Sequence, residues 1–389
     1  MKADINFLKE EFFRKFGDRA KDPVVFYSPG RVNLIGEHTD YNGGYVFPCA
    51  LDFGTSLVAR KIEKHEIRLA SLNFPGDLVI SVSSSYTAIK GSWTNYPVGV
   101  INEFAKKGIA APGLELLFYG DIPNGAGLSS SASIELVMAV AMNELTASRL
   151  DTMELVKIGQ RAENLFVGMN CGIMDQFAVA FGRKDHAINL NCDTLEYKYA
   201  PLRLGTRRLI ITNTNKRRGL TDSKYNERRS ECEKAVEFIS AHRRISNLSE
   251  LTVNDLSLLD KCIPDEVVRR RARHVITENA RTLGAINALE KDDIETFGRL
   301  MNESHDSLST DYEVTGVELD TLVYEGRRLP GVTGTRMTGA GFGGCTVSIV
   351  EGEHAGSFIE KLGAVYTEKT GLMADFYLPG IGDGARRID

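Results

Sequence analysis

Four ionisable side chains fall within ten residues of a glycine-rich segment near the start of the chain. They are Arg31, Glu37, His38 and Asp40, in the string GRVNLIGEHTDYNGG. Glycine permits a tight backbone path, so these groups could converge on one small polar ligand. Carboxylates and an imidazole form hydrogen bonds in fixed directions, which suits recognition of sugar hydroxyls. A polar surface turn whose charges pair with one another is the alternative, and it stays open on residue types alone.

A second segment, PNGAGLSSSAS at 123–133, combines glycines with a run of serines. It separates a strand-like segment at 114–119 from a strongly helical pattern, so backbone N–H groups would face outward at a helix N-terminus. Such a terminus binds anions, and phosphates above all. The serines could add donors, and one could hold Mg²⁺ on the phosphates. A plain N-cap needs one serine and not three, so phosphate binding is favoured, although no Walker A triplet occurs.

The third segment, TGAGFGG at 338–344, fits the spacing GxGxxG. A dinucleotide-binding fingerprint follows a strand, opens a helix and lies near the start of a βαβ unit. This segment comes late in the chain and precedes a β-rich run at 345–350. We therefore expect a close backbone approach, either to a ligand or to the other two loops.

Two acids lie between the second and third loops. Asp175 falls in the otherwise apolar string CGIMDQF, where an unpaired carboxylate would be costly, so it should have a partner or a task. A structural aspartate that only forms hydrogen bonds is the alternative. Glu163 falls on a predicted helix and is, from the sequence alone, an unremarkable exposed acid.

Helices and strands alternate around these groups. Hydrophobic periodicity predicts helices at 5–17, 96–107, 129–140 and 151–167, and a mostly helical region at 222–306. Asp151 is the expected N-cap of the 151–167 helix, and Glu154 would complete a capping box. Strands are predicted at 24–27, 45–60, 66–72, 78–83, 114–119, 186–191, 208–213 and 345–350. The class is α+β, with an N-terminal domain at 1–205 that holds the first two loops and a C-terminal domain at 206–389 that holds the third.

Length and composition limit the class of protein. A chain of 389 residues is too long for one ordinary core and suits two domains. Its net charge of −5 gives no general electrostatic reason to expect nucleic acid or a membrane surface as partner. The six cysteines lack zinc-site spacing, and there is neither an apolar signal core nor an apolar run long enough to span a bilayer. We expect a cytoplasmic protein with reduced thiols.

Taken together, the four strings resemble the GHMP kinase superfamily and, within it, the galactokinase family. GRVNLIGEHTDYNGG is similar to that family's signature, GAGLSSSAS resembles its phosphate loop, and CGIMDQF and TGAGFGG resemble its later motifs. Their order and rough spacing agree over nearly the whole chain, with little specific signal at 230–310. The resemblance implies a two-domain fold with the site in the cleft between the domains, and transfer of phosphate from ATP to the C1 hydroxyl of galactose with Mg²⁺. We expect a monomer.

The resemblance also implies which residues bind each group. The sugar pocket would comprise Glu37, His38, Asp40, Gly172, Asp175 and Tyr225. The phosphates would be wrapped by Gly125, Ala126, Gly127, Leu128, Ser129, Ser130 and Ser131, with Mg²⁺ on Ser131 and Glu163. Trp93 and Tyr96 match a family pattern near the adenine, with simple core packing as the alternative.

For catalysis, we hypothesise that Asp175 accepts the proton of the C1 hydroxyl. Arg31 would keep that aspartate ionised and stabilise charge on the transferring group.

Kinases of the superfamily that act on N-acetylgalactosamine, mevalonate or homoserine are the nearest alternatives. A mevalonate or homoserine site has no need for the cluster from Glu37 to Asp40, which suits a polyhydroxylated ligand. N-acetylgalactosamine is harder to exclude, but the kinases that act on it resemble this string less well at Thr39 and Asn42. A sugar sensor without activity is the other alternative, and the complete serine run at 129–133 speaks against it.

Overall fold

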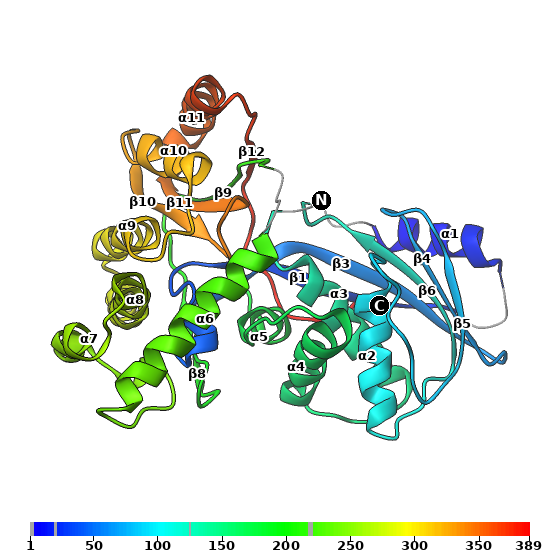
Figure 1. Ribbon diagram of the computed structural model, residues 1–389. Coiled ribbons are helices and arrows are strands. Elements are labelled where there is room, and N and C mark those ends of the chain that lie inside the picture. Colours follow the sequence, from blue (N-terminus) through cyan, green and yellow to red (C-terminus); the bar gives the residue numbers. More distant parts are fainter. Residues whose placement is uncertain (1–3, 19–21, 124–125, 217–220) are drawn as a thin grey trace.

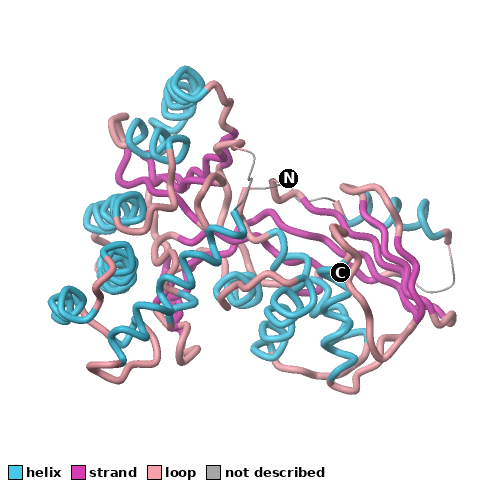
Figure 2. The backbone as a smooth tube through the Cα atoms, in the orientation of Figure 1, coloured by secondary structure: helices cyan, strands magenta, loops and turns pink. Residues whose placement is uncertain are grey.

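The computed structural model describes residues 4–18, 22–123, 126–216 and 221–389. The strands in these ranges form sheets of six, four and three strands, and helices pack on both faces of the two larger sheets (Figure 1). In Figure 2 the two larger sheets lie in different halves of the molecule. This arrangement confirms the predicted α+β class.

The six-stranded sheet has the order β13-β1-β3-β6-β4-β5 and is antiparallel except where β4 pairs with β6. Its strands are β1 (Val24–Asn33), β3 (Pro48–Ile62), β4 (Glu66–Ser71), β5 (Leu78–Ser81), β6 (Gly113–Gly120) and β13 (Arg386–Arg387). The last strand brings the end of the chain back beside β1, where Phe26 is opposite Arg387.

Helices cover the two faces of this sheet unequally. On one face, α1 (Ile5–Phe16) places Leu8 and Phe12 against apolar side chains of the sheet. On the other face a larger core forms beneath α2 (Asn95–Lys106), α3 (Ser130–Leu145), α4 (Thr152–Arg161), the π-helical turn η2 (Ala162–Val167) and α5 (Met174–Phe181). The core is wide because α3 is apolar around most of its circumference, as expected of a helix buried between a sheet and other helices.

The four-stranded sheet has the order β10-β11-β9-β12 and is antiparallel throughout. Its strands are β9 (Arg207–Asn213), β10 (Val332–Thr338), β11 (Cys345–Glu351) and β12 (Asp375–Tyr377). On one face lie α10 (Val317–Gly326) and α11 (Ala355–Thr370), and on the other α8 (Glu266–Glu290) and α9 (Ile294–Thr310).

The remaining elements lie between and beside these two sheets. A small sheet is formed by β2 (Tyr45–Val46), β7 (His186–Asn191) and β8 (Tyr197–Pro201). Helix α6 (Thr221–Ser240) runs diagonally across the face shown in Figure 1, with α7 (Leu256–Cys262) at its far end. The short helices are η1 (Asp40–Asn42), η3 (Leu248–Glu250), η4 (Val253–Asp255) and η5 (Gly352–His354).

One hydrophobic core joins the two halves. It combines residues of β1 and β3, such as Val32 and Leu51, with Val347 of β11 and Phe297 of α9. The halves therefore share packed side chains, which holds the loops after β1 against the glycine-rich turn between β10 and β11.

Most predicted elements are confirmed, with two informative differences. β1 does not end at Tyr27 but continues to Asn33, because a register shift between Pro29 and Arg31 absorbs the Ser-Pro-Gly segment. Asp151 caps α4 by accepting from the backbone of Glu154, as predicted, at 2.8 Å. The Glu154 carboxylate does not reach back to complete a capping box, because it pairs with Arg161 and Lys107.

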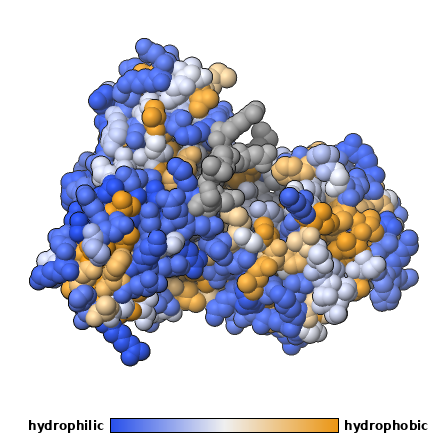
Figure 3. All heavy atoms as spheres, in the orientation of Figure 1, coloured by the Kyte–Doolittle hydropathy of each residue, from blue (hydrophilic) through white to orange (hydrophobic). Residues whose placement is uncertain are grey.

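The face shown in Figure 3 is mostly hydrophilic, with apolar side chains gathered mainly toward the end of the large sheet marked by β5 in Figure 1. Among the described helices, none combines the length and the apolar character that crossing a bilayer requires. The six cysteines, all within the described ranges, form no disulfide bond.

Candidate active site

Arg31 is positioned by the irregular part of β1. Its backbone N–H leaves the strand pairing and donates to the carbonyl oxygen of Leu128 in the second loop, at 3.1 Å. A Cβ atom on Gly30 would lie 2.9 Å from the same oxygen, so only glycine allows this close approach. The bulge therefore brings the first glycine-rich segment directly against the second.

The structure places Arg31 in contact with Asp175, which lies 144 positions further along the chain. The Nε and Nη2 atoms of Arg31 lie 2.8 and 2.6 Å from Oδ1 of Asp175. Its Nη1 atom donates to the carbonyl oxygen of Gly127, at 2.8 Å. Because both carboxylate contacts use Oδ1, and 26% of the Asp175 side chain is exposed, Oδ2 stays available to a ligand.

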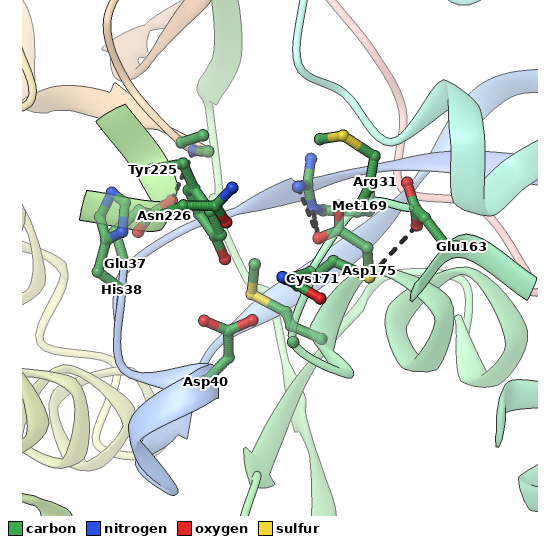
Figure 4. A pocket seen from close by; sticks show the side chains of 15 residues that line it. Arg31, Glu37, His38, Asp40, Glu163, Met169, Cys171, Asp175, Tyr225 and Asn226 are labelled. Atoms are coloured by element: carbon green, nitrogen blue, oxygen red, sulfur yellow. Dashed lines mark hydrogen bonds and ion pairs between the residues drawn. The ribbon is translucent and has the colours of Figure 1, made fainter. Parts of the chain in front are cut away.

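This pair borders a cavity of about 170 Å³ that is lined by residues from both halves of the molecule (Figure 4). Every residue that the resemblance implies for the sugar lies in its wall. The lining includes Arg31, Glu37, His38, Asp40, Glu163, Gly172, Asp175, Tyr225, Asn226 and Ala340. The volume suits a ligand of monosaccharide size, and the polar groups reach it from several directions.

Asp40 and Gly172 form one side of this cavity. Asp40 begins the short helix η1, and a Cβ atom on Gly172 would overlap its Oδ2 atom. Burial raises the pKa of Asp40 to about 7, the Asp175 carboxylate nearby adds to the rise, and Arg31 opposes it. Asp40 is therefore a carboxyl that changes charge near neutral pH.

His38 faces the cavity from a left-handed backbone conformation, with φ of 64°. Its Nδ1 atom lies 2.8 Å from the Tyr41 hydroxyl, while Nε2 is buried and makes no hydrogen bond of normal geometry among the described residues, although the Ala340 backbone lies close enough to affect the pKa of the ring. Burial lowers the pKa of His38 to about 3, so the ring is neutral at pH 7. Tyr225 of α6 packs 5.8 Å from the His38 ring, measured between centroids. A neutral ring nitrogen without a well-formed hydrogen bond to the protein is suited to a ligand hydroxyl.

Glu37 is 1% exposed and connects the first loop to the third. Its Oε2 atom lies 2.6 Å from Nη1 of Arg336 and accepts from Asn33 at 2.8 Å. Its Oε1 atom accepts from the backbone N–H of Gly339 at 2.9 Å and from Thr338 at 3.2 Å. The carboxylate is thus fixed by protein donors where it meets the cavity wall.

The third loop is the turn of the β10–β11 hairpin and not the start of a helix, so the rejection of a dinucleotide fingerprint is confirmed. Gly339 has φ of 84°, and a Cβ atom there would lie 3.2 Å from the carbonyl oxygen of Gly127. Together with the bond to Glu37, this contact confirms the predicted close approach of the third loop to the other two.

Glu163 lies on the π-helical turn η2 and is 7% exposed. It hydrogen-bonds Ser131 and accepts from Gln176 at 2.6 Å, and burial raises its pKa. Within the described ranges, no group of three or more His, Cys, Asp or Glu side chains is placed to hold a metal ion. Mg²⁺ is often held by one or two protein oxygens together with substrate phosphates. The hard oxygen donors of Ser131 and Glu163 fit that pattern.

A second cavity, of about 160 Å³, lies beside the same serine run. Its wall includes Trp93, Tyr96, Ser130, Ser131, Asn73 and Phe118. The structure therefore brings the two aromatic residues implied for the adenine next to the phosphate loop. Trp93 also packs edge-on against Phe118 at 5.5 Å between centroids, so it contributes to the core as well. Gly125, which the resemblance implies for the phosphates, lies outside the described residues.

Several site residues were not predicted from the sequence. Asn226 follows Tyr225 on α6 and lines the first cavity, as does Ala340 of the third loop. Arg336 is fully buried beneath Glu37. Ala340 could have been found from its place inside TGAGFGG, whereas Asn226 and Arg336 carry no local signal.

Known proteins match the chain over its whole length. Residues 10–61 match the galactokinase galactose-binding signature, residues 95–183 the N-terminal domain of GHMP kinases, and residues 285–368 their C-terminal domain. The mevalonate kinase structure of Methanococcus jannaschii shares the fold, with a TM-score of 0.67 at 19% identity over 94% of this chain and 100% of that chain. The chain thus has the architecture of a GHMP kinase.

Relatives with higher sequence identity define the class of kinase more closely. The galactokinase of Clostridium beijerinckii is 51% identical over 388 residues, 99% of each chain, and that of Bacillus subtilis is 49% identical over 98% of each. The structure of Lactococcus lactis galactokinase complexed with galactose is 43% identical, with a TM-score of 0.96, and the match covers 99% of this chain and 100% of that one. The chain belongs to the galactokinase family, whose members are ATP-dependent sugar kinases.

Proposed function

We propose that this chain transfers the γ-phosphoryl group of ATP to the C1 hydroxyl of D-galactose, giving galactose 1-phosphate and ADP. The observation that carries the proposal is the Arg31–Asp175 pair. It faces a cavity of monosaccharide size and, through Gly127, touches the glycine–serine loop. The similarity to a galactokinase complexed with galactose supports this choice of sugar.

In the proposed step the C1 oxygen forms a bond to the γ-phosphorus while the bond from that phosphorus to the β–γ bridging oxygen breaks. Asp175 takes the proton of the C1 hydroxyl as the new bond forms, and ADP leaves. Arg31 stabilises the negative charge that spreads over the transferring oxygens and holds Asp175 in place. Positioning and charge neutralisation supply most of the acceleration in such transfers.

The other wall residues would bind and orient the sugar. We propose that His38, through its Nε2 atom, and Asp40 bind hydroxyls, and that Gly172, Tyr225 and Glu37 complete the pocket. Because Glu37 is already bonded to protein donors, its main contribution would be a fixed polar wall.

We propose that the second loop, from Gly125 to Ser131, binds the phosphates and that Trp93 and Tyr96 lie near the adenine. Ser131 and Glu163 would hold Mg²⁺, which neutralises charge on the phosphate oxygens when it is bound.

We further propose that the protein is a cytoplasmic monomer. Its domain boundary would lie near residue 205, between β8 and β9.

The position of the phosphate tests the proposed reaction. Galactose, MgATP and the purified protein should give a product whose phosphorus couples to the anomeric proton in a ¹H–³¹P correlation spectrum. Coupling to the C6 protons instead, or no sugar phosphate at all, would contradict transfer to C1.

The kcat/KM for galactose should depend on pH because the Asp40 carboxyl titrates. Its raised pKa means that the carboxyl is largely protonated below pH 7 in the free protein, and a protonated carboxyl is a poorer acceptor for a sugar hydroxyl. We expect kcat/KM for galactose to fall as pH is lowered through about 7, by at most about tenfold per unit. Asp40→Asn should lower kcat/KM and abolish its fall toward acidic pH. If kcat/KM of Asp40→Asn still falls through the same pH range, another group is responsible for the titration.

Replacing Gly172 should weaken sugar binding. The added methyl of Gly172→Ala overlaps Asp40 Oδ2, so Asp40 must move from the cavity wall. We expect KM for galactose to rise roughly tenfold or more, about 1.4 kcal/mol of binding, with a smaller change in kcat. Gly356→Ala is the matched control, because a Cβ atom there meets open space. A Gly172→Ala protein with an unaltered KM would remove this residue from the sugar site.

A further inference from the structure

Behind Glu163 lies a buried acid that the proposed mechanism does not use. Glu135 is on α3 and is 0% exposed. Its Oε2 atom accepts a hydrogen bond from Nε2 of Gln176 at 3.0 Å, and Oε1 has no partner in the part of the chain that the structure describes. A buried carboxyl with an unsatisfied oxygen reduces stability compared with an apolar residue, so packing alone does not account for it.

The Gln176 amide joins this acid to Glu163. Its Nε2 atom donates to Oε2 of Glu163 at 2.6 Å as well as to Glu135, and Gln176 is itself 0% exposed. An amide nitrogen has two N–H groups, so the two carboxyl groups use its full donor capacity. Gly159 of α4 makes room for the bridge, because a Cβ atom there would lie 3.3 Å from Cγ of Gln176.

The positions of these residues connect both sides of the reaction. Glu135 and Ser131 are four residues apart on α3, which places them on the same face of that helix. Gln176 follows Asp175 on the first turn of α5. A chain of hydrogen bonds therefore links Ser131 and Glu163 to the helical turn that carries Asp175. Figure 4 shows Glu163 and Asp175 on the same side of the cavity.

We propose that Glu135 and Gln176 are positioning residues, which hold the Glu163 carboxylate at a fixed place relative to Ser131 and Asp175. Glu135 orients the Gln176 amide, and the amide fixes Oε2 of Glu163. The bridge thereby sets the separation between the divalent cation on the nucleotide and the aspartate at the sugar hydroxyl. This inference rests on the proposed function, because it assumes that Glu163 is a cation ligand.

The test measures cation binding directly, with Mn²⁺ as the probe. Mn²⁺ affinity is measured by electron paramagnetic resonance at saturating ADP. Glu135→Leu removes the acceptor, and we expect Mn²⁺ affinity to fall about tenfold or more, as for other residues that support metal ligands. The Kd for galactose, measured by calorimetry, should change by less than about twofold, which is a small change in binding free energy. Glu135→Gln keeps an acceptor oxygen for the Gln176 amide, so this variant should retain most of the wild-type Mn²⁺ affinity.

Val137→Ala is the control for lost packing in α3, because Val137 is buried on the same helix and its side chain offers no hydrogen bond. It should lower the melting temperature and leave Mn²⁺ affinity unchanged. If Glu135→Leu does not fold, Gln176→Met is measured in its place. This substitution removes both N–H donors of the bridge. Wild-type Mn²⁺ affinity in the folded bridge variant, or an equal loss in Val137→Ala, would overturn the proposal. Failure of the wild-type protein to phosphorylate galactose would instead refute the proposed function.

Discussion

Replacing Asp175 by asparagine is expected to lower kcat by about 10²–10⁴-fold, the usual contribution of a general base. The amide keeps an oxygen that can accept from Arg31, as Oδ1 of Asp175 does at 2.8 Å, so the wall of the cavity should keep its shape. What is lost is the group that accepts the proton. Galactose binding, measured by calorimetry without nucleotide, should therefore largely survive.

Asp151→Asn is the matched control for this substitution. Asp151 caps α4, and asparagine is an equally good N-cap, so activity and stability should both be unchanged. An Asp175→Asn protein that keeps more than about a tenth of the wild-type kcat would fall outside the range for a general base. Asp175 would then act mainly as an oriented charge beside Arg31.

Replacing Arg31 by alanine is expected to lower kcat about 10²–10³-fold, as for loss of a group that stabilises transition-state charge. KM for galactose should rise much less, because Arg31 contacts Asp175 and Gly127 and is itself only 4% exposed. Steady-state kinetics with galactose and MgATP varied in turn separates the two effects.

Arg31→Lys separates charge from geometry. Lysine keeps the positive charge but cannot contact Oδ1 of Asp175 with two nitrogens while a third reaches the carbonyl of Gly127. We expect an intermediate kcat. The reverse pattern for Arg31→Ala, a large rise in KM with kcat near the wild-type value, would make Arg31 a binding residue.

Much of the fold could be predicted because local patterns agree with it. The segment Ser28-Pro29-Gly30 predicts the end of a strand, because such residues normally stop one, and this prediction is wrong. Here the strand continues because the bulge is supported from outside: Leu128 accepts from Arg31, and Gly54 of β3 leaves room for the backbone of Ser28. Contacts of this kind join distant parts of the chain and leave no mark in local sequence.

Prediction of the site residues from the sequence has the same limit. The cluster from Glu37 to Asp40 and the serine run could be read from residue types, because each is dense in groups that suit one ligand. Glu163 could not, since its place depends on a π-helical turn and on the packing of η2 near Ser131. Glu135 is an isolated acid in the apolar stretch 134–142 of α3, and only the hydrogen bonds of Gln176 connect it with Glu163.

The most direct test of the central claim is an ADP-release assay with purified protein, MgATP and four sugars side by side: galactose, glucose, N-acetylgalactosamine and talose. We predict rapid ADP release with galactose, and much slower release with glucose and N-acetylgalactosamine; talose reports how far the pocket tolerates change at C2. Absence of sugar-dependent ADP release with galactose, or a clear preference for N-acetylgalactosamine, would contradict the account.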